Sequence, residues 1–238
     1  MMIPQGELMK LFEQLSNRNL PVRLLNTYRG FPVAHEARVV STRKGYLVLD
    51  VHPEQATCLS LENKTYVQAE LLPEAYKAQV VAVDLAKNQA VLSEFTSAGN
   101  ALGKRMAVRV QPQAPVEAVI YDGEHRVPGQ LVDISTSGVG IFTVATYIYS
   151  DLCFEKGMSV FIDFRMPSTE DIIRLKGKIN SVTHQQGTFL HRLGLSILPN
   201  PNAEPALKQY VTLRQQEIVD ELKRVSASMR QEQPRRIN

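Results

Sequence analysis

The feature that most constrains this chain is a succession of short runs in which apolar and polar residues alternate. Successive side chains of a strand point to opposite faces, so this alternation predicts strands with one buried face. No long helical pattern lies between the runs, which disfavours a parallel sheet with its crossover helices. The runs form two blocks: residues 21–25, 31–40, 45–51, 65–72, 76–85 and 89–95, then residues 116–121, 125–134, 138–149, 158–166, 172–182 and 188–197.

Six closely spaced runs in each block predict two small six-stranded antiparallel β-barrels, and therefore a mainly β protein. The length of 238 residues suits two domains of about a hundred residues each. Turn signals support the antiparallel pairing. Arg43-Lys44-Gly45 predicts a hairpin between two runs of the first block, and Lys87-Asn88 predicts a turn before the last one.

Two helices are expected outside the barrels. Leu8, Leu11, Phe12 and Leu15 follow helical spacing, which predicts a short amphipathic helix near the N-terminus. A longer helix should begin near Glu204, with an apolar face on which polar residues interrupt a heptad-like series. Two interpretations of it stay open: it forms a homodimer, or its first half covers a barrel end while its second half frays. Its apolar positions are Val211, Ile218, Leu222, Val225 and Met229, and the polar interruptions are Lys208 and Gln215.

These patterns divide the chain into five expected segments. Residues 96–103 are mostly small and include two glycines, as is typical of a linker. We expect an N-terminal helix and barrel over residues 1–97 and a linker over 98–109. A second barrel over 110–202, a C-terminal helix over 203–230 and a disordered tail over 231–238 should follow.

Composition excludes several classes of function. The net charge of +3 is too small to predict a nucleic-acid partner, and neither a signal peptide nor a membrane span is apparent, so we expect a cytoplasmic protein. Two distant cysteines and five histidines without close ligand spacing predict no metal site. A nucleophile elbow and both nucleotide-binding glycine loops are missing as well. The sequence therefore predicts neither an enzyme nor a cofactor.

The most informative stretch lies at the end of the linker. Lys104, Arg105 and Arg109 gather there, and no acidic residue occurs between Glu94 and Glu117. Arginine suits a phosphate or the O6 and N7 edge of guanine because its planar guanidinium binds such groups through two parallel hydrogen bonds. These residues therefore indicate a site for an anionic, guanine-containing ligand.

A second group follows on a predicted strand. Asp133 and Ser135 are two residues apart and share one face, while Ile134 between them can face the core. A carboxylate can accept the N1 and N2 protons of guanine, and the hydroxyl can add a bond to base or phosphate. Gly138 would allow close approach of a ligand or a turn with positive φ. A plain β-turn, with both side chains bonded to their own backbone, is the structural alternative.

Together these residues resemble the PilZ family of cyclic di-GMP receptors, whose signature is RxxxR followed by [DN]xSxxG on a barrel strand. Arg105 and Arg109 match the first motif, and Asp133, Ser135 and Gly138 match the second. The resemblance implies that the arginines hold phosphates and guanine edges while the acid and the serine recognise a guanine. The N-terminal barrel and linker are similar to the YcgR-type arrangement, in which the ligand changes the interdomain arrangement.

Further residues follow from the same resemblance. Lys104 precedes RxxxR, where a basic residue is associated in this family with two stacked ligand molecules. Gly194 belongs to a closing-strand motif LGxxF, from which Ile197 departs by replacing the aromatic residue. The implied output is regulation of motility, biofilm formation or polysaccharide synthesis through a protein partner such as flagellar or biosynthetic machinery.

The sequence leaves two alternative functions open and argues against a third. A PilZ-fold adaptor would bind protein partners without the nucleotide. A flavin enzyme is suggested only by the strand count of the first barrel. Nucleic-acid binding by two small barrels lacks the basic and aromatic stripe it needs, because aromatic residues make up 7% of the chain and tryptophan is absent.

Overall fold

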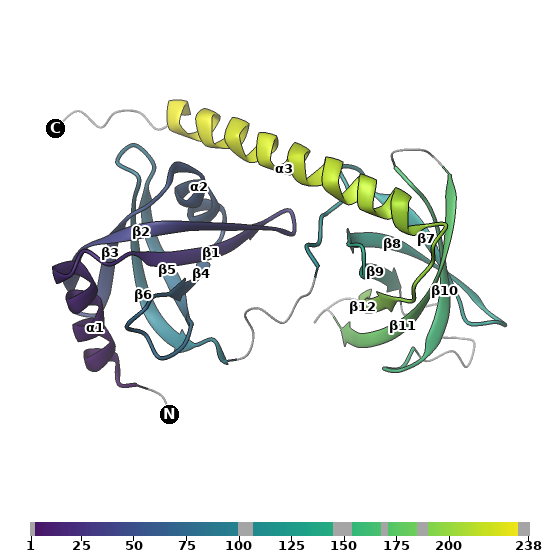
Figure 1. Cartoon of the computed structure of the whole chain (residues 1–238), viewed down its shortest axis with the longest axis horizontal. Coiled ribbons are helices and arrows are strands. Elements are labelled where there is room, and N and C mark those ends of the chain that lie inside the picture. Colours follow the sequence, from purple (N-terminus) through teal and green to yellow (C-terminus); the bar gives the residue numbers. More distant parts are fainter. Residues whose placement is uncertain (1–2, 100–106, 145–153, 168–170, 185–189, 233–238) are drawn as a thin grey trace. The chain divides into compact units, whose positions relative to one another are not determined.

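The computed structural model describes residues 3–99, 107–144, 154–167, 171–184 and 190–232. The chain divides into two compact units, each built on one closed six-stranded antiparallel barrel, as the sequence predicts (Figure 1). The last helix contributes residues 204–217 to the second unit and residues 218–232 to the first. The expected linker core at 100–106 and most of the expected disordered tail, residues 233–238, lie outside the described residues.

The first barrel has the strand order β1-β2-β3-β6-β5-β4. Both predicted turns are present: Lys44 and Gly45 have φ values of 48° and 86°, and Asn88 has a φ of 52°. Positive φ at both central residues suits the two-residue hairpin turn, whose twist matches that of the flanking strands. The strands are β1 (Val22–Tyr28), β2 (Phe31–Arg43), β3 (Tyr46–Asp50), β4 (Lys64–Gln68), β5 (Tyr76–Asp84) and β6 (Gln89–Ser97).

Helix α1 (Gln5–Asn17) completes the first core. Leu8, Phe12 and Leu15, which the helical spacing singled out, are all fully buried, and the Phe12 ring packs at 5.2 Å from the ring of Phe95 on β6. Inward-facing residues of every strand meet them, because each strand alternates buried and exposed positions. The short amphipathic helix is therefore part of the barrel core.

Helix α2 (Pro53–Leu61) was not predicted. Its nine residues bury five successive side chains, Gln55 to Leu59, so they show no helical alternation of apolar and polar positions. The local signals that exist are Pro53 at the first turn and His52, whose Nδ1 accepts a hydrogen bond from the Glu54 backbone N–H at 3.3 Å. Packing on the barrel, rather than amphipathic pattern, thus determines this helix.

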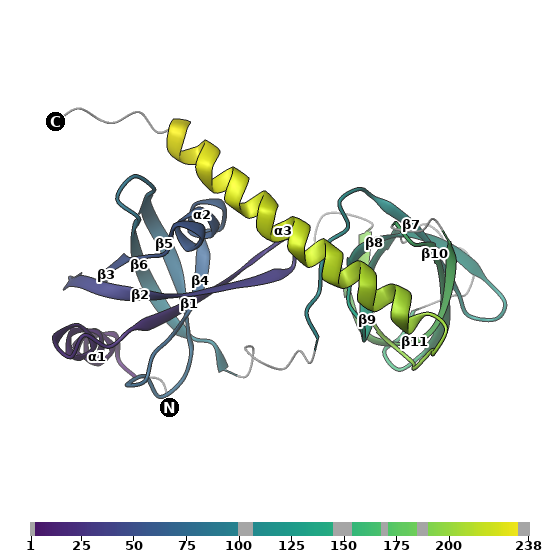
Figure 2. The same ribbon diagram turned by 45° about the horizontal axis from the view of Figure 1, so that its top comes forward.

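The second barrel has the strand order β10-β11-β12-β9-β8-β7, which closes through a β7–β10 pair (Figure 2). Fully buried aliphatic residues from its strands, among them Ile120, Ile141, Leu175 and Leu193, fill its interior. The strands are β7 (Val116–Tyr121), β8 (Arg126–Ile134), β9 (Gly138–Val144), β10 (Ser159–Arg165), β11 (Ile172–His184) and β12 (Leu190–Ile197).

Helix α3 (Glu204–Glu232) begins at the predicted residue. The Asn200 side chain accepts hydrogen bonds from the backbone N–H groups of Asn202 and Ala203, which caps the entrance to the helix. The helix is continuous to Glu232. None of the described helices carries an apolar stretch long enough to cross a membrane.

Candidate functional site

The site begins where the chain enters the second barrel. Val110 is fully buried and forms an isolated β-bridge with Ile134, through two backbone hydrogen bonds of 2.9 Å. The buried side chain of Val110 and its pairing with Ile134 together fix the backbone beside the end of β8. Arg109 precedes Val110 and lies opposite Ser135 in this antiparallel pairing, from where its long side chain reaches Asp133.

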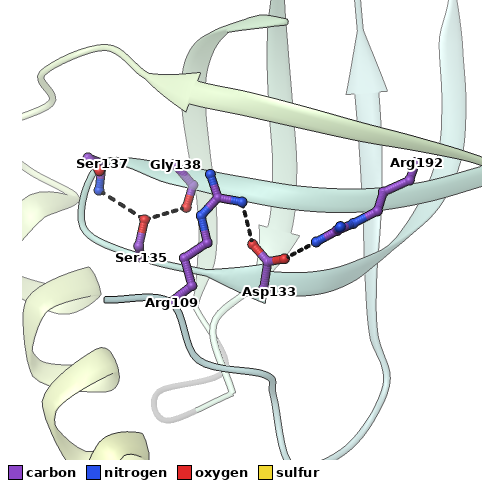
Figure 3. A network of polar contacts seen from close by, with 6 residues as sticks. All are labelled: Arg109, Asp133, Ser135, Ser137, Gly138 and Arg192. Carbon is purple, nitrogen blue, oxygen red and sulfur yellow. Dashed lines mark hydrogen bonds and ion pairs between the residues drawn. The ribbon is translucent and has the colours of Figure 1, made fainter. Parts of the chain in front are cut away.

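Asp133 lies at the centre of a three-residue network (Figure 3). Arg109 Nη1 donates to Asp133 Oδ1 at 3.2 Å, and Arg192 Nη2 donates to Asp133 Oδ2 at 2.5 Å. The Asp133 side chain is 7% exposed, whereas those of Arg109 and Arg192 are 26% and 43% exposed. A nearly buried carboxylate is therefore paired with two long cationic side chains that reach solvent.

Glycines form the floor beside this carboxylate. Gly140 on β9 is paired with Asp133 on β8 and with Gly194 on β12. A Cβ at Gly140 would meet Asp133 Oδ2 at 2.8 Å, and a Cβ at Gly194 would meet Ser181 Oγ at 2.6 Å. The Asp133 carboxyl group therefore occupies the space over Gly140, and the Ser181 hydroxyl occupies the space over Gly194. The two glycines let these polar side chains lie directly against the backbone.

Ser135 and Gly138 form the tight turn between β8 and β9. Ser135 Oγ donates to the Gly138 carbonyl at 2.9 Å and accepts from the Ser137 backbone N–H at 3.4 Å. A Cβ at Gly138 would lie 2.5 Å from the Leu195 carbonyl oxygen of β12, so close strand packing requires glycine there. The Ser135 hydroxyl bonds the backbone of its own turn, as a plain β-turn would have it, whereas Asp133 bonds two arginines.

The strand that carries Arg192 separates charge from the core. His191, its neighbour, is 9% exposed and its ring lies 4.0 Å from that of His184. Burial first, and the nearby His184 second, lower the pKa of His191, so the imidazole is neutral at pH 7. On the outer face, Arg109 and Arg192 outnumber Asp133 by two to one.

The structure brings together some of the predicted residues and adds two. Arg109 and Asp133 are in direct contact, and Gly194 lies one strand beyond Gly140 in the same row. Lys104 and Arg105 lie outside the described residues. Sequence reasoning missed Arg192 and Gly140. Both carried a signal, because Arg192 is two residues from Gly194 and Gly140 two from Gly138, so alternation places each pair on one face.

Comparison with known families decides the identity of this unit. The family model described as "PilZ domain" matches residues 103–213. These residues are a PilZ domain. The match takes in the arginines of the entrance, the complete second barrel and the start of α3, and so covers every residue of the network around Asp133.

Relatives and solved structures resemble longer parts of the chain. An uncharacterised protein of Aquifex aeolicus is 29% identical over 161 residues, which is 66% of this chain and 71% of that protein. YcgR of Escherichia coli in complex with c-di-GMP is 15% identical, with a TM-score of 0.45, over 93% of this chain and 95% of that one. The motility inhibitor MotI (DgrA) of Bacillus subtilis is 16% identical, with a TM-score of 0.42, over 83% and 96%.

Proposed function

We propose that this protein is a receptor that binds cyclic di-GMP on the outer face of its PilZ domain and performs no chemistry on it. The observation that carries the proposal is the Arg109–Asp133–Arg192 network beside the glycine floor. It joins one arginine of the RxxxR motif to the aspartate of DxSxxG, and contains donors and acceptors suited to a guanine nucleotide. YcgR, among the similar structures, is recorded in complex with c-di-GMP.

Asp133 is the proposed guanine acceptor. A carboxylate has two oxygens that can accept the N1 and N2 protons of a guanine together. In the free protein those oxygens are occupied by Arg109 and Arg192. Guanine binding then exchanges one set of charge-assisted donors for another, so Asp133 never loses its partners inside the site. Gly140 supports this role because it leaves room for the Asp133 carboxyl group on the outer face of the sheet.

The arginines released from Asp133 are the proposed phosphate ligands. Each phosphate of cyclic di-GMP carries one negative charge, and an arginine can hold two phosphate oxygens at once or stack on a base. Arg109 and Arg192 outnumber Asp133 by one charge, and Lys104 and Arg105 would add two more. The complete set would thus exceed the ligand's charge, which favours binding and fast association.

Binding is also the proposed switch. The two phosphates would draw Arg105 and Arg109 toward the Asp133 strand, and so fix the linker and change the interdomain arrangement. The altered protein would then act in the cytoplasm on a protein partner that controls motility, biofilm formation or polysaccharide synthesis. Small-angle scattering with and without cyclic di-GMP tests this step, and identical profiles at saturation would contradict it.

Calorimetric titration with cyclic di-GMP tests the receptor itself. We expect micromolar or tighter binding, and a loss of at least about 2 kcal/mol in Arg109→Ala because charge-assisted bonds to phosphate disappear. Arg174→Ala is the matched control, since Arg174 forms the comparable pair with Asp163 on another part of the barrel. GMP controls for the guanine alone, and the stoichiometry in Lys104→Ala tests the second ligand molecule.

Two outcomes would contradict the proposal. Unchanged affinity in Arg109→Ala would remove the entrance arginine from the site. No heat at any accessible concentration would favour the adaptor function instead, in which the PilZ domain binds a protein partner without the nucleotide.

A further inference from the structure

The first barrel holds a second cluster of chemically active side chains, far in sequence from the PilZ motifs. His35 lies on β2, and His52 and Glu54 lie at the start of α2. Their nitrogen and oxygen atoms all lie within 4.8 Å of one another. In the described part of the chain, this is the one group of three such side chains that close together.

The fold positions each of the three groups. His35 follows the alternation of Val33 and Ala37, which are buried, so its side chain is directed inward and is only 29% exposed. His52 is the N-cap of α2, where its Nδ1 accepts from the Glu54 backbone N–H. While Nδ1 accepts this bond, the ring proton lies on Nε2, so a metal ion would bind His52 either at Nδ1, in place of the 3.3 Å cap, or at Nε2 after a change of tautomer. Glu54 follows in the first turn, 22% exposed.

The distances fit the coordination of one small cation. His35 Nε2 and Glu54 Oε2 are 3.3 Å apart. Two ligands that lie about 2.0–2.1 Å from a tetrahedral zinc ion are themselves about 3.3–3.4 Å apart. The His35 and His52 rings are stacked, with centroids 3.9 Å apart and planes inclined by 13°. The in-plane lone pairs of stacked rings run parallel, so one ring must rotate for both imidazoles to face the same ion.

The residue types also fit a metal better than a purely structural role. Histidine is not among the residues preferred at a helix N-cap, where serine, threonine, aspartate or asparagine bond the backbone better. An ion pair of His35 with Glu54 would need no second imidazole against it.

We propose that His35, His52 and Glu54 form a binding site for a divalent transition-metal ion of the zinc class. Two imidazoles and one carboxylate favour such an ion over calcium or magnesium, which prefer oxygen ligands. Three protein ligands leave a fourth position for water. Cys58 on the same helix is fully buried, and its sulfur is not among the ligand atoms that lie within 4.8 Å of one another.

Cobalt serves as the spectroscopic probe, since zinc itself is colourless. We expect the chelator-treated full chain to develop a visible absorption band that saturates at one equivalent of Co²⁺ and disappears when Zn²⁺ is added. His52→Asn should abolish the band while it keeps a preferred N-cap on α2. Glu54→Gln, which keeps the length of the side chain and removes its charge, should weaken it.

His184→Ala is the matched control. His184 also lies against a second histidine, with ring centroids 4.0 Å apart, but this pair has no third ligand in the described residues. The control should keep the cobalt band. A second readout is thermal unfolding: Zn²⁺ should raise the melting temperature of the unchanged protein and of His184→Ala, but not that of His52→Asn.

The proposal fails if no saturable band appears at millimolar Co²⁺, or if the band and the zinc-induced thermal shift persist in His52→Asn. Cyclic di-GMP titration of the same variants is independent of both outcomes, because none of the three residues belongs to the PilZ domain.

Discussion

Each barrel contains a nearly buried polar side chain, yet the two are stabilised in different ways. Asn26 in the first barrel is 3% exposed and bonds Gln55, Thr65 and Glu62. Asp133 in the second is 5% exposed and bonds the two arginines. The partners of Asn26 are positioned by α2 and neighbouring strands, whereas those of Asp133 are long side chains that reach solvent. A fixed network contributes to stability, and an exchangeable one leaves room for a ligand.

The largest effect is expected for Asn26→Ala. Its amide accepts from Gln55 Nε2 and Thr65 Oγ1, both at 2.7 Å, and donates to Glu62 and to the Lys64 carbonyl, both at 2.8 Å. Loss of these bonds leaves buried groups unsatisfied and should lower the free energy of unfolding by about 3 kcal/mol. Urea denaturation measures this, with Gln89→Ala, which removes an exposed bond, as the control. Weaker cyclic di-GMP binding in Asn26→Ala would break the distinction between the barrels.

Asp133→Ala should show the opposite profile. We expect the affinity for cyclic di-GMP to fall by about 2 kcal/mol, since the guanine loses a charged acceptor. Stability should change by less than about 1 kcal/mol, because the arginines left behind can be solvated. Calorimetry and urea denaturation of one preparation measure both quantities. A destabilisation as large as that of Asn26→Ala would show that the carboxylate is mainly structural.

Gly140→Ala sharpens the comparison by changing the floor and not the charges. The new methyl group would lie 2.8–3.0 Å from three atoms of the Asp133 carboxyl group, which would have to move. We expect about tenfold weaker cyclic di-GMP binding, equivalent to about 1.4 kcal/mol. Gly6→Ala is the control, because nothing lies within 4 Å of that position. Equal affinity in both variants would argue against a role of the Asp133 carboxyl group in binding.

The smallest effect concerns pH. The side-chain hydrogen bond from Arg174 is the main cause that lowers the pKa of Asp163 in the folded PilZ domain. A lowered folded-state pKa contributes stability above the unfolded value, and this contribution is lost as the pH falls through the folded-state pKa. Asp163→Asn should therefore flatten the acid side of the stability curve slightly. An unchanged curve between pH 5 and the acid transition would show that the Asp163–Arg174 pair makes no measurable contribution to the free energy of unfolding.

The strands of both barrels could be predicted because alternation, turn residues and short spacing all agree. Helix α2 could not, since its side chains are buried on nearly every side and leave no pattern. Within the site, Arg109 and Asp133 were found through motifs. Arg192 was missed because its partnership with Asp133, 59 positions away, depends on the register of β8, β9 and β12.

The sequence by itself determined the two-barrel fold, the helices at its ends and the two motifs of the PilZ domain, because these depend on local periodicity and short spacing. Only the tertiary structure decided which groups meet. It set Arg109 and Arg192 on one carboxylate and brought His35 together with His52 and Glu54. The physical reason is that strand register and helix packing bring distant residues within bonding distance, and no local pattern records them.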